Sequence, residues 1–180
     1  GYIEQFAIDY SQLSQINPRI IMVSITPFGQ SGPYRNYKAP DIVGMALSGI
    51  LYLTGDFDRR PVWSGFPESY LFAAMDGAIG ALAALYHRSS TGEGQHVDIS
   101  MQRSLYSTTY YAAPFWVANK LIARRAGALR ERPETGIVYR IHWPCKDGYV
   151  AFALLGGLAG MRNNQKLVAW MDSKGMATDF

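Results

Sequence analysis

Leu85-Tyr-His-Arg-Ser-Ser-Thr-Gly-Glu-Gly-Gln-His-Val-Asp-Ile-Ser-Met101 is the stretch that decides the fold of this chain. It joins a helix, expected over residues 67–88, to a short strand through the turn Thr91-Gly-Glu-Gly94. The helix carries alanine and glycine around its axis, interleaved with large apolar side chains, a pattern typical of a buried helix. After the turn, Val97 and Ile99 alternate with polar neighbours, as in a half-buried strand. We therefore expect a helix–turn–strand unit within a layered core.

A second strand is expected upstream, over residues 19–26, where apolar and β-branched residues form a nearly continuous run. Such runs are typical of strands buried in a parallel sheet. Glycine and proline in Phe28-Gly-Gln-Ser-Gly-Pro33 end the strand. Because α/β sheets usually bind ligands at the carboxyl ends of their strands, this loop is a candidate binding loop.

Three further helices are expected around these strands. Two of them follow aspartates, the residue type that caps helix N-termini: Asp9 before residues 10–16 and Asp41 before residues 42–53. The third covers Met101–Asn119, with a kink at Pro114.

The last third of the chain differs in composition. Residues 120–136 are rich in arginine and are expected to be a linker; the arginines could reach a phosphate, but a solvated linker is favoured. A hairpin is expected next, from Ile137–Trp143 and Tyr149–Leu154, joined by Lys146-Asp-Gly148. The predicted organisation is thus a domain over 1–119, a linker over 120–136 and the start of a smaller domain over 137–180.

Composition narrows the possible functions. The chain has 180 residues, is 48% hydrophobic and carries a net charge of +3, too weak for a nucleic-acid-binding surface but suited to a polyanionic cofactor. Its one cysteine, Cys145, excludes an internal disulfide, and the three histidines lack ligand spacing, so no metal site is expected. No apolar run reaches the roughly 18 residues of a membrane span, and a cytoplasmic protein without a membrane partner is expected.

Three blocks in the same order give the chain a family resemblance. They are Asn17-Pro-Arg-Ile-Ile with its continuation to Tyr34, the Thr91-Gly-Glu-Gly-Gln turn, and Cys145-Lys-Asp-Gly-Tyr-Val150. Together they resemble the class III CoA-transferases, a family that also contains acyl-CoA racemases and carnitine CoA-transferases. The resemblance implies an α/β fold: part of a Rossmann-like parallel-sheet large domain, then a linker and the start of a smaller α+β domain.

The same resemblance implies substrates and partners. Coenzyme A, as acyl-CoA, and a carboxylic acid would be the substrates, and the full-length protein would form an interlocked homodimer. Members of the family are considerably longer, so we interpret this chain as the central part of a larger polypeptide; a self-contained relative is the alternative.

The catalytic residue is the main departure from the family pattern. The transferases use an aspartate at the start of the small-residue helix, and ungapped counting from the Thr91 turn puts Tyr70 in its place. Tyrosine cannot form an acyl anhydride, and a neutral phenol is a poor nucleophile. Glu68 is the nearby carboxylate and the candidate nucleophile or acid/base; a structural role, in which it complements the helix dipole, is favoured. The alternatives are a CoA-binding pseudoenzyme and an acyl-CoA isomerase or lyase.

Candidate cofactor-binding residues also come from the resemblance. Lys38 matches a family lysine near the CoA phosphates, although a solvated loop lysine is an equal possibility. Gly156, Gly157 and Gly160 match a glycine-rich loop that covers the transferase active site; a plain turn is the alternative. Ala39-Pro40 occupies the place of a racemase histidine, which argues against racemisation.

Overall fold

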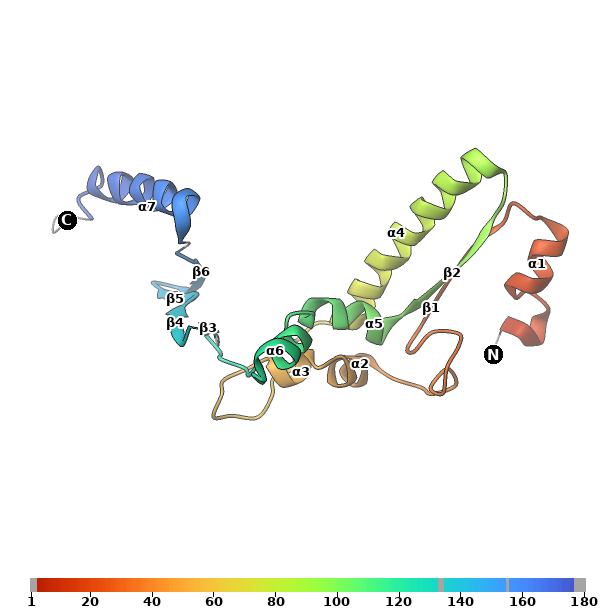
Figure 1. Cartoon of the computed structure of the whole chain (residues 1–180), viewed down its shortest axis with the longest axis horizontal. Coiled ribbons are helices and arrows are strands. Elements are labelled where there is room, and N and C mark those ends of the chain that lie inside the picture. The colour runs from red at the N-terminus through yellow and green to blue at the C-terminus, as the bar shows by residue number, and fades with distance from the viewer. Residues whose placement is uncertain (1–2, 133–134, 155, 177–180) are drawn as a thin grey trace. The chain divides into compact units, whose positions relative to one another are not determined.

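The computed structural model describes residues 3–132, 135–154 and 156–176. Two compact units, Gly1–Arg125 and Ala126–Phe180, make up the chain. The first contains η1 (Ile3–Phe6), α1 (Tyr10–Ile16), β1 (Ile21–Thr26), α2 (Asp41–Ser48), α3 (Ile50–Leu53), α4 (Glu68–Thr91), β2 (Gln95–Ser100), α5 (Met101–Tyr106), η2 (Ser107–Thr109) and α6 (Ala112–Asn119). The second contains β3 (Leu129–Arg132), β4 (Ile137–Arg140), β5 (His142–Cys145), β6 (Gly148–Ala151) and α7 (Gly157–Asp172) (Figure 1).

The first unit is organised by a parallel strand pair and its crossover helix. β1 and β2 pair in register from Ile21↔Gln95 to Thr26↔Ser100, and α4 packs on both strands (Figure 1). A Cβ at Gly77 would lie 3.1 Å from Ile25 Cδ1, and one at Gly80 would lie 2.5 Å from Val97 Cγ1. The small residues of α4 therefore allow the helix to lie directly against the sheet, which confirms the expected α/β layer.

Two glycines build the turn between α4 and β2. Gly92 ends α4 in the left-handed region at φ +83°, with its N–H bonded to the Arg88 carbonyl, a conformation that glycine adopts without strain. Gly94 donates its N–H to the Pro18 carbonyl at 2.8 Å. A Cβ at Gly94 would lie 1.9 Å from the Ile20 carbonyl oxygen, so only glycine fits there.

One side of α4 is exposed, in contrast to the expectation of a wholly buried helix. Its buried residues are Ser69, Ala73, Gly77 and Ala84, whereas Met75, Ile79 and Leu82 are exposed. Within the described part of the chain, α4 packs mainly on β1, β2, α2 and α5, and this side stays uncovered. The physical reason is that a single two-stranded layer covers only one face of a helix.

α4 is also the one helix of the described residues that is long and apolar enough, by length and composition alone, to cross a membrane. This differs from the expectation that no segment reaches such a length. Core helices of soluble proteins pass the same test. Because α4 packs against the sheet through Gly77 and Gly80, we interpret it as a crossover helix.

The helix expected over residues 101–119 is interrupted before its proline rather than at it. α5 ends at Tyr106, and α6 begins at Ala112. Pro114 has no N–H to donate to the carbonyl four residues earlier, at Tyr110, and its ring crowds that carbonyl. The missing bond accounts for the irregular residues just before α6, whereas α5 has already ended at Tyr106 and Ser107–Thr109 form η2.

The second unit consists of two hairpins and a helix. β3 pairs with β4, and β5 pairs with β6, both antiparallel. The expected turn at Lys146-Asp-Gly148 is confirmed, and it joins His142–Cys145 to Gly148–Ala151. The first expected strand, Ile137–Trp143, is wrong in part, because Ile137–Arg140 pairs with β3 instead. β3 lies within the segment expected to be a linker. The domain bounds 1–119, 120–136 and 137–180 themselves remain a prediction.

Candidate active site

The site is built at the first turn of α4, where Asp41 holds Ser69. Ser69 donates its backbone N–H to Asp41 Oδ1 at 2.8 Å and its hydroxyl to the same oxygen. Trp63 donates its indole N–H to Asp41 Oδ2 at 2.9 Å. Asp41 and Ser69 are both buried. We refer to these three side chains as the Asp41 clamp.

The role of Asp41 differs from the one expected. Asp41 is the first residue of α2, whose N-cap is Pro40, so Asp41 does not cap its own helix. Its carboxylate instead accepts the Ser69 N–H in the first turn of α4, where the N-cap residue Pro67 offers no side-chain acceptor. The α2 helix itself ends at Gly49, at φ +87°.

Glu68 and Tyr70 lie on either side of the clamped serine. Successive residues of an α-helix are about 100° apart, so an inward-pointing Ser69 places Glu68 and Tyr70 on opposite flanks. Glu68 is half-buried, and Tyr70 is 47% exposed. Within the described residues the Glu68 carboxylate makes no hydrogen bond or ion pair. Its oxygens are chemically available, whereas both oxygens of Asp41 are occupied.

The candidate binding loop follows β1 and is held by β2. Gly29 and Gly32 have φ +85°, and Asp98 accepts the Gln30 N–H at 2.8 Å. The loop borders a hollow of about 880 Å3, lined by β1 and by polar residues that include Gln30, Arg35 and Asn36. The lining includes neither Glu68 nor Lys38. Sequence reasoning missed Arg35, because a single loop arginine carries no pattern of its own.

The candidate cofactor-binding residues fall in both units. Lys38 is exposed in the loop before α2, three residues ahead of Asp41, so the clamp brings this loop close to the start of α4. In the second unit, Gly156 is the N-cap of α7 and Gly157 is its first residue, at φ +77°. Gly160 lies in the first turns of α7 and is buried. The glycine-rich loop that the resemblance implies at these positions is therefore wrong: Gly156 caps a helix, and Gly157 and Gly160 lie in it.

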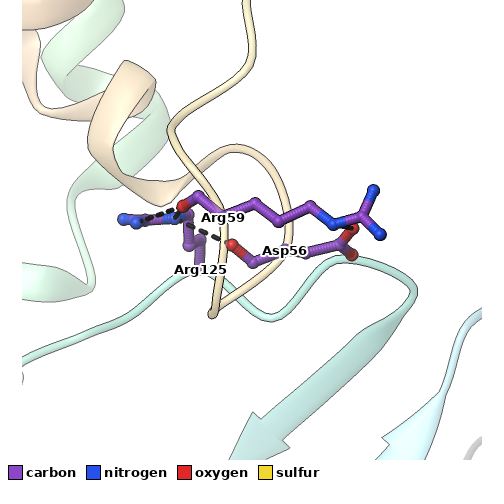
Figure 2. A network of polar contacts seen from close by, with 3 residues as sticks. All are labelled: Asp56, Arg59 and Arg125. Carbon is purple, nitrogen blue, oxygen red and sulfur yellow. Dashed lines mark hydrogen bonds and ion pairs between the residues drawn. The ribbon is translucent and has the colours of Figure 1, made fainter.

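Two further polar groups of the first unit, Arg125 and His96, have structural partners. The Arg125 guanidinium donates to the carbonyls of Asp56 and Arg59 (Figure 2) and to that of Tyr52. A ligand-binding role for Arg125 is thus not available without breaking these bonds. His96 bonds to Ser24 Oγ at 2.9 Å and stacks on Tyr10. Among the described residues, no group of three or more His, Cys, Asp or Glu could hold a metal ion.

A family model and several curated proteins match this chain along most of its length. The family model described as CoA-transferase family III matches residues 1–179. The chain is 34% identical over 179 residues to the succinyl-CoA:(R)-benzylsuccinate CoA-transferase subunit BbsE of Thauera aromatica, covering 98% of this chain and 41% of that protein. It is 32% identical over 148 residues to the succinyl-CoA–D-citramalate CoA-transferase of Chloroflexus aurantiacus, covering 82% of this chain and 36% of that protein.

A solved structure resembles the fold over the same extent. The CAIB/BAIF family protein from Brucella suis superposes with a TM-score of 0.75 at 27% identity, covering 98% of this chain and 44% of that one. The chain thus spans less than half the length of the relatives it matches.

Proposed function

Because this chain belongs to CoA-transferase family III, we propose that the protein moves CoA from an acyl-CoA to a carboxylic acid, with Glu68 as nucleophile. The observation that supports this role is the difference between two carboxylates at the start of α4. Asp41 is buried with both oxygens hydrogen-bonded, whereas Glu68 is half-buried, and its carboxylate has no partner within the described residues.

The proposed chemistry is a double displacement at the Glu68 carboxyl group. The carboxylate attacks the thioester carbonyl and expels CoA as a thiolate, leaving a mixed anhydride. The thiolate then attacks the Glu68 carbonyl of the anhydride, which releases the donor acid and leaves a glutamyl-CoA thioester. The acceptor carboxylate repeats the two steps in reverse, leaves as its CoA thioester and regenerates Glu68.

The names of the relatives suggest which substrates to try first. Relatives at 32–34% identity are named for succinyl-CoA as donor and for benzylsuccinate, citramalate or malate as acceptor. These acceptors are all dicarboxylic acids. We propose succinyl-CoA and a dicarboxylate as the substrate classes of this protein, with Lys38 near the CoA phosphates as a point charge.

The test is CoA exchange by the full-length protein between succinyl-CoA and a panel of dicarboxylates. Glu68→Gln removes the nucleophile while keeping the side-chain size, and exchange should fall at least about 1,000-fold, since covalent catalysis is lost. Glu93→Gln, on an exposed glutamate in the turn after α4, is the matched control and should retain wild-type activity. Exchange that survives Glu68→Gln would remove Glu68 from the mechanism.

A second candidate function follows from Tyr70. The chain has tyrosine where the family nucleophile is expected, and several relatives are named as subunits: BbsE, and the alpha and beta subunits of succinyl-CoA–L-malate CoA-transferase. In this alternative the chain binds CoA and a second family III chain supplies the carboxylate. Activity only after mixing with such a chain, together with an active Glu68→Gln variant, would favour it over a homodimer that acts alone.

A further inference from the structure

The start of α4 is capped by a residue from another helix. Pro67 precedes α4 and provides no side-chain oxygen for the free N–H groups of the first turn. Asp41, 28 residues earlier, accepts the Ser69 N–H at 2.8 Å in its place. The cap therefore satisfies an N–H group at the N-terminus of α4 and also joins α4 to α2.

The Asp41 clamp restricts the first turn more than an ordinary cap does. One carboxylate accepts three donors, two from Ser69 and one from Trp63, and Ser69 is fully buried. Hydrogen bonds to an ionised acceptor are strong, and away from water they are stronger still. A Cβ at Gly44 would lie 3.2 Å from the Ser69 Cβ, so α2 and α4 are also in close contact at this point.

The clamp determines which way the residues beside Ser69 face. Ser69 is held inward by its bonds to Asp41, so the first turn of α4 has one orientation and Glu68 lies on one flank of it. We propose that Asp41 is a positioning residue, which holds the first turn of α4 so that Glu68 is presented to the thioester. This inference rests on the proposed role of Glu68, because it assigns Asp41 no contact with substrate.

The test compares two capping aspartates in the full-length protein, assayed with succinyl-CoA and the best dicarboxylate acceptor. Asp41→Ala should lower kcat by about 10- to 100-fold, because a misplacement of about 1 Å costs that much, while KM for succinyl-CoA changes by less than about threefold. Asp9→Ala removes the N-cap of α1 and should leave both constants within about twofold. Asp41→Asn keeps an oxygen for the Ser69 N–H and should restore kcat to at least about five times the Asp41→Ala value.

Each outcome decides the matter. A kcat within threefold of wild type in Asp41→Ala, no rescue by Asp41→Asn, or an equal loss in Asp9→Ala would overturn the positioning role. If Asp41→Ala does not fold, Trp63→Phe removes one donor from the clamp, and an unchanged kcat in that variant would overturn the role as well. An active Glu68→Gln variant would overturn the proposed nucleophile instead, so the two failures are distinguishable.

Discussion

Replacing Gly94 by alanine should damage the junction between α4 and β2 more than any other single methyl group added to this turn. The new Cβ would lie 1.9 Å from the Ile20 carbonyl oxygen and 2.6 Å from the Arg19 carbonyl carbon. These are backbone atoms, so no side-chain rotation can relieve the contact. The chain must move by at least 1.1 Å to reach 3.0 Å, below which real Cβ contacts are essentially absent.

This movement lowers the free energy of unfolding in two ways. The Gly94 N–H bonds to the Pro18 carbonyl at 2.8 Å, and a shift of this size lengthens the bond beyond hydrogen-bonding distance. Losing the bond costs about 1 kcal/mol, and the residual overpacking costs about 2 kcal/mol. Gly94→Ala should therefore lower the free energy of unfolding by about 3 kcal/mol.

Urea unfolding of the full-length protein measures this difference through the transition midpoint. Gly92→Ala, in the same turn, places alanine at φ +83° and should cost about 1 kcal/mol. Gly148→Ala has no atom within 4 Å of its Cβ and should stay within about 0.5 kcal/mol of wild type. A Gly94→Ala variant no less stable than Gly92→Ala would refute the steric reasoning.

Three other perturbations test separate parts of the fold. Gly80→Ala should cost about 2 kcal/mol, because its Cβ would lie 2.5 Å from Val97 Cγ1; a second change, Val97→Ala, should recover part of the urea midpoint, and no recovery would contradict the contact. In Arg125→Lys, the lysine cannot donate to three carbonyls at once, so the free energy of unfolding should fall by about 1 kcal/mol. The loop before Pro61 should then be cleaved faster by trypsin, and an unchanged rate of cleavage would show that Arg125 does not hold this loop. The Ser11 hydroxyl, followed by the Gln12 and Ser11 N–H groups, lowers the pKa of Asp9 from its ordinary value. A carboxyl group whose pKa is lowered by folding stabilises the fold above its unfolded-state pKa, and this stabilisation is lost as the pH falls. In Asp9→Asn the melting temperature should therefore fall less steeply below about pH 4 than in wild type. Equal slopes of melting temperature against pH would exclude a contribution from this cap.

Features encoded by neighbouring residues could be predicted from the sequence. Asp9 caps α1 by accepting the N–H groups two and three residues later in the chain. Gly92 and Gly94 lie in the short turn between α4 and β2, where the sequence itself indicates a change of chain direction. The carboxylate of Asp41 was predicted to act locally as well, but its partner is Ser69. Nothing in the sequence pattern distinguishes a cap for the next residues from a cap for a helix that begins 27 positions later.

The candidate site shows the same limit. The sequence identified Glu68 as an available carboxylate and Tyr70 as an obstacle, because both depend only on position relative to Thr91. It could not identify the fully buried Ser69 between them as the fixed point of the turn, since burial depends on α2 and on the space left by Gly44. The family resemblance implied a glycine-rich loop at Gly156, Gly157 and Gly160, but α7 begins at Gly157.

Covalent attachment of CoA at residue 68 is the most direct test of the proposed function. Full-length protein is incubated with succinyl-CoA without an acceptor and is then digested with a protease that works at low pH. The peptide that contains residue 68 is analysed by mass spectrometry. CoA should be found on Glu68 as a thioester and should disappear when a dicarboxylate is added. Turnover accompanied by an unmodified Glu68, with CoA carried by another residue or another chain, would contradict the proposal.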